Sequence, residues 1–447
     1  MQEKYGCLAL PLNLMKRREF LKISSLATAG LLAGCAANPV TGKSQLMLVS
    51  EETEIEVDQQ YAPHQFSLDY GVSQDEQLNA YLRQTGHRIS THTHRTHMPY
   101  SFKVVNATYV NAYAFPGGSI AVTRGILLKL DDEAQLAALL GHELGHVNAR
   151  HTAQQMSKGM LTQAVVGGLS IVAGTQSAAL GQLSSSLGML GAGALLAKYS
   201  RDNEREADAL GMEYMVRSGY GPQGFVGLMQ MLNTLSKHKA GSTELLFATH
   251  PMSDERYQAA VEAERGRYAS AMDQPLYRER FLDHTAALRG IRKAVEAMQA
   301  GDKYLAQKNF SAAEAQFQKA LRQAPGDYAA LVMMAKCQLL QKKFIEAGDY
   351  ADEAKKVNPT EAQAHYLSGL AKIQTKSFEA AYVDFSTYDQ LLPGNPTTLF
   401  FKGYALEGQQ RVPESAQAYH KYLQTVQQGD KARHAYQRLV QWGYIKQ

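Results

Sequence analysis

The sequence predicts a mainly helical α+β domain with a small β-hairpin or sheet, followed by an all-α solenoid. Three observations support this prediction: a helical pattern that carries paired histidines, short strand patterns before it, and a 34-residue period near the C-terminus. The 447 residues suggest two to three domains at roughly 150 residues each. The expected boundaries are 1–35 for a signal peptide, 36–270 for the front domain, 271–293 for a linker helix and 294–447 for the repeats.

The composition excludes several classes of protein. Lys and Arg number 46 against 42 Asp and Glu, a net charge of +4 without a block of like charge, so we expect no nucleic-acid partner. A hydrophobic content of 45% excludes global disorder. The three cysteines (Cys7, Cys35 and Cys337) are too few for a disulfide framework or a Cys-ligated structural zinc. Any metal must therefore be held by His and carboxylates, and we expect Cys337 to be a small apolar residue inside a repeat helix.

The first 35 residues resemble a bacterial lipoprotein signal. A basic segment with Arg17 and Arg18 precedes an apolar run over residues 23–33, which is too short to span a bilayer. The run ends in Leu-Ala-Gly-Cys35, which resembles a lipobox and implies lipidation at Cys35. Ala36 rather than Asp in the next position implies the periplasmic side of the outer membrane. The paired arginines also resemble a twin-arginine export signal; the general secretory route is the alternative.

Three strand patterns precede the helix with the paired histidines. They cover Ser101 to Val105, Asn111 to Phe115 and Ser119 to Thr123, and a turn at Gly117-Gly118 joins the last two as a hairpin. An exposed edge at Asn111, Ala112, Tyr113 and Ala114 would hold an extended peptide by strand addition. Simple packing of these strands in the core is the alternative.

The helical pattern contains His142-Glu143-Leu144-Gly145-His146. Asp131-Asp132-Glu133 marks its start, and leucines at helical spacing predict that it is largely buried. Residues four apart on a helix differ by about 40° in azimuth, so His142 and His146 project from one face and can chelate one zinc ion beside Glu143. A buried helix whose histidines hydrogen-bond within the core is the alternative.

A second helical pattern offers the further carboxylate that zinc needs. Glu204 and Asp208 are again four apart, so Glu204 can ligate the metal while Asp208 accepts the outer N–H of a liganding histidine. Glu206, the rival ligand, is turned about 160° from the face of Asp208, and we expect it to be solvated. His151 points off the metal face and is expected to be structural. The metzincin pattern, which adds a third histidine six residues after the second, is excluded, because Thr152 occupies that position.

These motifs resemble a known peptidase family. His-Glu-x-x-His followed by Glu-x-x-x-Asp is the pattern of gluzincins, and Ser-Arg-x-x-Glu-x-x-Ala-Asp over residues 200–208 resembles HtpX-related and BepA-like members. Residues 38–43, residues 111–118 and Thr249-His250-Pro251 also resemble BepA-like lipoproteins. The resemblance implies a zinc metalloendopeptidase with one Zn²⁺ per chain and Glu143 as general base, which degrades misfolded or misassembled envelope proteins.

The same resemblance makes His250 a candidate switch. In BepA-like proteins the matching histidine can occupy the fourth zinc position, which would displace the water and keep the enzyme inactive until the loop moves. Stabilisation of an oxyanion, or capping of the helix expected after Ser253, are alternatives for His250.

The C-terminal part repeats every 34 residues. Pro325, Pro359 and Pro393 share this spacing, and columns of Gly or Ala and of Phe follow it. Small residues allow paired helices to approach, and the proline ends the second helix. The pattern resembles about four tetratricopeptide repeats, which implies recruitment of substrate or of the outer-membrane assembly machinery. Packing against the front domain alone is the alternative.

Two other segments invite functional readings. Residues 159–197 are uncharged, but polar residues and glycines interrupt them, so we expect helices over the active site rather than membrane spans. An integral-membrane processing protease is therefore disfavoured. His87, His92, His94 and His97 fit no regular face and are expected in a solvated loop rather than a second metal site. A chaperone or scaffold of outer-membrane assembly with an idle site remains the alternative function.

Overall fold

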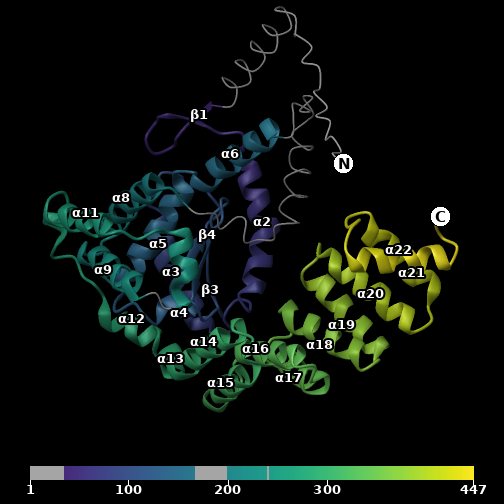
Figure 1. Ribbon diagram of the computed structural model, residues 1–447. Helices are drawn as coiled ribbons and strands as arrows, with labels where there is room; N and C mark the ends of the chain where they lie inside the picture. The colour runs from purple at the N-terminus through teal and green to yellow at the C-terminus, as the bar shows by residue number, and fades with distance from the viewer. Residues whose placement is uncertain (1–34, 167–198, 239–240, 447) are drawn as a thin grey trace, which may run out of the picture.

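The computed structural model describes residues 35–166, 199–238 and 241–446 (Figure 1). The predicted signal peptide and most of the uncharged 159–197 stretch lie outside these residues; Cys35 begins the first strand. Among the described helices, none is both long and apolar enough to cross a membrane.

A three-stranded sheet lies at the centre of the front domain, as the strand patterns predicted. Its order is β3 (Ser101–Val105), β5 (Ser119–Thr123), β4 (Ala112–Ala114), with β3 parallel and β4 antiparallel to β5. Alternate residues face opposite sides of a strand. Accordingly, Phe102 and Ile120 join the main core, whereas Ala121 packs with Val57 of helix α2 (Glu51–Leu68). Figure 1 shows α2 on one side of the sheet and α5 on the other.

The helices of the front domain surround one central helix, α5 (Glu133–Asn148), in which every residue is buried. Asp132 caps it by accepting from the backbone N–H of Gln135 at 2.8 Å. The other elements are β1 (Cys35–Ala37), β2 (Ser44–Leu46), α3 (Glu76–Ser90), α4 (Arg124–Leu127), α6 (His151–Val166), α8 (Arg201–Arg217), α9 (Gln223–His238), η2 (Gly241–Thr243), α10 (Glu244–Thr249), α11 (Asp254–Arg265) and η3 (Ala269–Ala271).

The segment 271–293 differs from the single linker helix that the sequence predicts. It contains two short helices, α12 (Arg278–His284) and α13 (Ala286–Gly290), before the first repeat helix begins. The bend follows the surface of the front domain, because Arg280 pairs with Glu133 at 2.5 Å and Arg289 donates to the carbonyl of Leu130 at 2.7 Å.

The repeats form a solenoid of paired helices. They are α14 (Arg292–Ala306), α15 (Phe310–Gln323), α16 (Tyr328–Leu340), α17 (Phe344–Val357), α18 (Ala362–Gln374), α19 (Phe378–Leu391), α20 (Pro396–Gly408) and α21 (Val412–Leu423), followed by α22 (Asp430–Gln441). A Cβ at Gly369 would lie 2.8 Å from the ring of Phe385 on the paired helix, which explains the column of small residues. Cys337 is buried in α16, as predicted.

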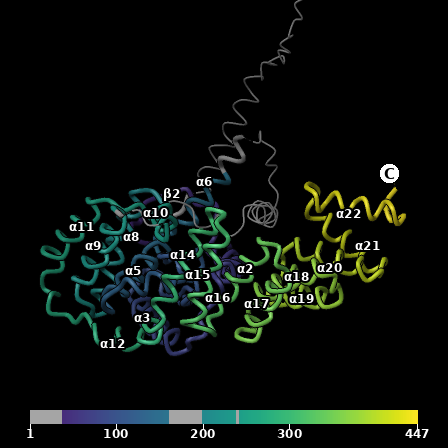
Figure 2. The backbone as a smooth tube through the Cα atoms, turned by 60° about the horizontal axis from the view of Figure 1, so that its bottom comes forward, coloured from purple at the N-terminus to yellow at the C-terminus, as the bar shows by residue number. Residues whose placement is uncertain are grey.

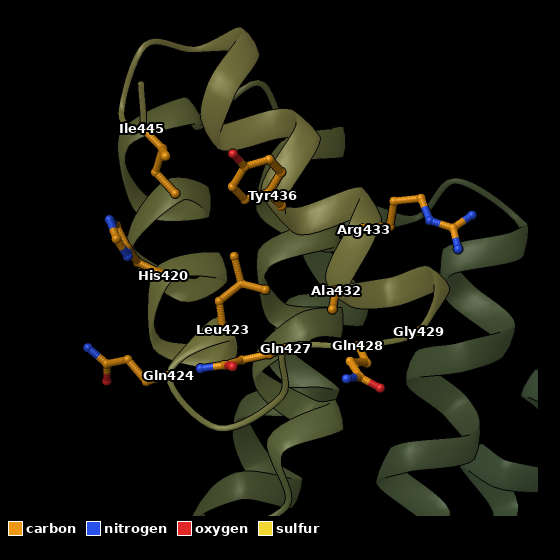
Figure 3. Close-up of a pocket in the computed structure, with 10 residues that line it drawn as sticks. All are labelled: His420, Leu423, Gln424, Gln427, Gln428, Gly429, Ala432, Arg433, Tyr436 and Ile445. Atoms are coloured by element: carbon orange, nitrogen blue, oxygen red, sulfur yellow. The ribbon is translucent and has the colours of Figure 1, made fainter. Parts of the chain in front are cut away.

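The first repeats pack against the front domain. Arg124 and Asp327, both nearly inaccessible to solvent, form an ion pair at 2.5 Å. Glu361 of the third repeat accepts hydrogen bonds from Ser67 and Tyr328. Packing against the front domain, one of the two expectations, is therefore observed for this part of the array. The last helices extend away from that contact (Figure 2), and a surface pocket of about 620 Å³ opens between α21 and α22 (Figure 3).

Candidate metal centre

Helices α5 and α8 approach closely because glycines line their crossing. A Cβ on Gly141 would lie 2.7 Å from the carbonyl oxygen of Gly211. A Cβ on Gly145 would lie 2.9 Å from the carbonyl oxygen of Ala207. This contact brings the two histidines of α5 next to Glu204, which lies near the start of α8.

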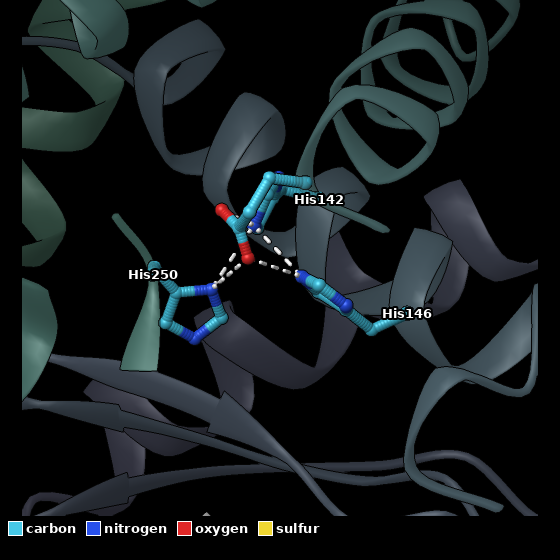
Figure 4. Close-up of side chains that lie close together, drawn as sticks. His142, His146 and His250 are labelled. Atoms are coloured by element: carbon cyan, nitrogen blue, oxygen red, sulfur yellow. Dashed lines mark hydrogen bonds and ion pairs between the residues drawn. The ribbon is translucent and has the colours of Figure 1, made fainter. Parts of the chain in front are cut away.

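Three imidazoles and one carboxylate converge in a buried cluster (Figure 4). The Nε2 atoms of His142 and His146 are 3.0 Å apart, and Oε1 of Glu204 lies 3.4 Å from Nε2 of His146. His250 joins from the loop after α10, with Nδ1 at 3.1 Å from Oε1 of Glu204 and 3.4 Å from Nε2 of His142. The structure thus brings together the three predicted ligands and His250, the candidate fourth ligand.

The spacing of these atoms fits a divalent metal ion. A tetrahedral site with bonds of about 2.0–2.2 Å places its donor atoms roughly 3.3–3.6 Å apart. The donor atoms of the cluster all lie within 4.8 Å of one another; two of the four contacts above, at 3.4 Å, fall in the expected range, and the other two, at 3.0 and 3.1 Å, are slightly shorter.

The contacts at the Nδ1 atoms of the two α5 histidines also favour a cation between their Nε2 atoms. Nδ1 of His142 lies 3.0 Å from Oδ1 of Asp208, as predicted, and Nδ1 of His146 lies 2.9 Å from Nδ1 of His151. In the tautomer of His142 with the proton on Nδ1, beside the carboxylate of Asp208, Nε2 carries a lone pair. With His146 in the same tautomer, two lone pairs and the carboxylate of Glu204 face one another in a buried position, an arrangement that a bound cation stabilises.

Arg256, which the sequence reasoning missed, holds the two carboxylates of α8. Its Nε and Nη2 donate to the two oxygens of Asp208 at 2.6 and 2.7 Å, and Nη1 lies 2.6 Å from Oε2 of Glu204. Nη1 also donates to the carbonyl of Pro251 at 3.0 Å, in the loop that carries His250. Burial works to raise the pKa of Asp208, but Arg256 outweighs it and the pKa is lowered. The sequence could have predicted that two buried carboxylates need a nearby cation, but it could not have predicted that Arg256 supplies it.

His151 and Glu206 have partners that the sequence did not predict. His151 is fully buried against His146, and its Nε2 lies 3.2 Å from Oε2 of Glu206, so Glu206 is not simply solvated. His151 lies off the metal-facing side of His146, as expected, and it reaches Nδ1 of His146 because α5 ends before His151. Arg150 adopts a left-handed φ of 59°, and α6 starts in a new direction.

Glu143 projects into the same space. It is 2% exposed, its Oε1 lies 4.0 Å from Nε2 of His250, and its Oε2 has no hydrogen-bond partner among the described residues. Burial raises the pKa of Glu143. Burial lowers the pKa of His146 well below its ordinary value. For Glu204, burial works to raise the pKa, but the neighbouring imidazoles, His250 first, outweigh it and hold the pKa well below its usual range.

Further contacts bear on three alternatives that the sequence left open: the role of His250, the exposure of the edge strand and the role of the loop histidines. Ser253, rather than His250, caps α11 by accepting from the backbone N–H of Arg256. The edge strand β4 is buried, yet both side-chain polar atoms of Asn111 have no hydrogen-bond partner in the described part of the chain. Within that part, the cluster above is the only group of three or more His, Cys, Asp and Glu side chains that could hold a metal. Nδ1 of His94 instead lies 2.7 Å from the hydroxyl of Tyr214.

Comparison with known proteins agrees with this geometry. Residues 76–264 match the model of peptidase family M48, and residues 304–373 match a tetratricopeptide repeat. The beta-barrel assembly-enhancing protease of Yersinia pestis is 29% identical over 238 residues, 52% of this chain and 48% of that protein. The protein of the same name in Escherichia coli K12 is 28% identical, over 41% of this chain and 38% of its own length.

A shorter relative is more similar in sequence. The metalloprotease YcaL of Escherichia coli K12 is 37% identical over 161 residues, 36% of this chain and 60% of that protein. The chain thus spans about half the length, or less, of the first curated relatives it matches. Residues 76–264 are thus similar to peptidase family M48, and a tetratricopeptide-repeat match follows them, which is the domain order that the motifs predicted.

Proposed function

We propose that the protein is a zinc-dependent endopeptidase of the bacterial cell envelope. The observation that carries the proposal is the convergence of His142, His146 and Glu204 beside Glu143, whose Oε2 has no hydrogen-bond partner among the described residues. Imidazole and carboxylate donors without cysteine suit a catalytic zinc. Bound zinc would supply Lewis acidity, polarising a peptide carbonyl and acidifying water.

Glu143 is the residue that moves the proton. Its buried carboxylate accepts the proton of the attacking water and can return it to the leaving amine. The raised pKa of Glu143 suits a group that must take up a proton during the reaction. Asp208 orients His142 through the contact at Nδ1, and Arg256 fixes Asp208.

The substrate is an extended polypeptide that adds to β4. The side-chain amide of Asn111, which has no hydrogen-bond partner in the described ranges, and the edge position of β4 support this placement of the substrate, since both offer hydrogen-bonding groups to a peptide backbone. Ala112, Tyr113 and Ala114 are buried in the present conformation, so neighbouring segments must move before a peptide can bind.

His250 would hold a bound metal as a fourth ligand in a closed state. Its Nδ1 lies among the donor atoms of the cluster, so the loop from Thr249 to Ser253 would have to withdraw before a substrate could take that position. His250→Ala should then raise proteolysis of an unfolded model substrate several-fold. Loss of proteolysis in this variant would instead support a direct catalytic role for His250.

The protein acts at the outer membrane, to which lipid on Cys35 anchors it. Its substrates are misfolded or misassembled envelope proteins, and its repeats contact substrate or the outer-membrane assembly machinery. Because the first repeats pack on the front domain, the last helices with the pocket near Leu423 and Tyr436 are the better candidate surface for such a partner. The names of the beta-barrel assembly-enhancing relatives support this assignment.

The test is a substrate trap. Glu143→Gln should retain about one zinc per chain, abolish cleavage and accumulate uncleaved envelope proteins in complex with the chain. Metal content is measured on the same preparation. A phenotype that Glu143→Gln leaves intact would favour the second candidate function, a scaffold of outer-membrane assembly whose closed, His250-ligated site is idle.

A further inference from the structure

A chain of hydrogen bonds runs from His146 away from the metal cluster to the N-terminal hairpin. Nδ1 of His146 contacts Nδ1 of His151 at 2.9 Å, Nε2 of His151 contacts Oε2 of Glu206 at 3.2 Å, and Nδ2 of Asn38 donates to Oε1 of Glu206 at 3.2 Å. These residues belong to four different segments: α5, α6, α8 and the loop between β1 and β2.

The contacts suit one arrangement of the ring protons. Glu206 can only accept when ionised, so Nε2 of His151 donates to it and Nδ1 of His151 is left as an acceptor. Nδ1 of His146 must then donate, which leaves the lone pair of its Nε2 toward Glu204. This arrangement holds His146 in the tautomer whose Nε2 lone pair can ligate a metal.

Asn38 is oriented for its part in this chain. Its Oδ1 accepts from the backbone N–H groups of Val40 and Thr41 at 2.8 and 3.2 Å, so its amide nitrogen faces Glu206. His151 and His146 are 0% and 1% exposed, and Asn38 is 5% exposed. Water therefore competes little for these bonds, except at Glu206, whose side chain is 26% exposed.

We propose that His151, Glu206 and Asn38 form a relay that positions His146 for metal binding, so that the N-terminal hairpin contributes to metal affinity. This inference rests on the proposed metal site and names three positioning residues that act through His146. Since Asn38 lies three residues after Cys35, the relay joins the segment next to the proposed lipid anchor to the metal centre.

The zinc dissociation constant of the full chain, measured by competition with a chromophoric chelator, tests the relay. Removal of groups that orient a metal-liganding histidine typically weakens metal binding by about 10–100-fold. We expect an effect of that size for His151→Leu and Glu206→Gln, and a smaller one in the same direction for Asn38→Ala.

Matched controls separate the relay from general destabilisation. Glu213 lies on α8 with a side chain as exposed as that of Glu206, 23% against 26%, but it pairs with Arg267 at 3.0 Å, so Glu213→Gln should leave zinc affinity unchanged. In zinc-loaded protein with ¹⁵N-labelled histidine, the Nδ1 proton of His146 should resist exchange with solvent, and Glu206→Gln should speed that exchange.

The outcomes distinguish the two proposals. Zinc affinity and Nδ1 proton exchange that remain at wild-type values in Glu206→Gln and Asn38→Ala would overturn the relay and leave the metal site standing. A wild-type chain that binds no zinc would overturn both.

Discussion

Replacement of Arg256 by methionine should destabilise the front domain more than any loss of a surface ion pair. Its guanidinium lies 2.6–2.7 Å from oxygens of Asp208 and Glu204 and is 6% exposed. Arg256→Met would leave two buried carboxylates without their cation. Breaking a buried pair costs about 3–5 kcal/mol. At roughly 2–4 °C per kcal/mol for a domain of this size, the melting temperature should fall by about 6–20 °C.

Thermal unfolding of the metal-free chain, followed by circular dichroism, measures this effect. Arg205→Met is the matched control, because Arg205 pairs with Asp202 and Glu255 on the exposed side of the same helices, with a side chain that is 47% exposed. Such surface pairs contribute about 0–1 kcal/mol. Equal, small shifts for both variants would refute the reasoning that Arg256 stabilises the centre. Added zinc should partly restore the melting temperature of Arg256→Met, because the ion supplies the missing positive charge.

Three further predictions concern buried contacts elsewhere in the chain and at the crossing of α5 and α8. Asp327→Asn keeps the helix cap but leaves Arg124 buried and unpaired, so limited proteolysis should cut between front domain and repeats at least tenfold faster. Burial raises the pKa of the Asp302 carboxyl to about 6, although Lys336 works to lower it. The free energy of unfolding should therefore fall as the pH rises through about 6, where the buried carboxyl loses its proton. The melting temperature of Asp302→Asn should exceed that of the wild type at about pH 7.5 but not at about pH 4. Gly141→Ala places a Cβ 2.7 Å from a backbone oxygen of α8 and should weaken zinc binding about tenfold or more; unchanged affinity would contradict the close-crossing argument.

Much of the fold and the main residues of the metal cluster can be predicted from the periodicity of the sequence. Residues four apart share a helix face, which suffices to predict that His142 and His146 act together and that Glu204 and Asp208 do so. The 34-residue columns of small residues likewise predict the paired helices, because a Cβ at Gly301 would meet the ring of Phe317.

The remaining features depend on contacts that no local pattern encodes. Arg256 approaches Glu204 only because α11 packs against α8, and His151 meets His146 only because the left-handed backbone of Arg150 separates α5 from α6. The docking of the repeats rests on single long-range pairs such as Arg124 with Asp327, which are 203 residues apart in sequence. Such pairs leave no periodic signal.

X-ray absorption at the zinc edge of the purified, zinc-loaded chain tests the central claim most directly. We expect one zinc per chain with about four nitrogen or oxygen ligands at roughly 2.0–2.1 Å, of which three are imidazoles, and no sulfur. His250→Ala should lose one imidazole and retain the metal. A spectrum without histidine ligands, or one that His142→Ala and Glu204→Ala leave unchanged, would contradict the proposed centre.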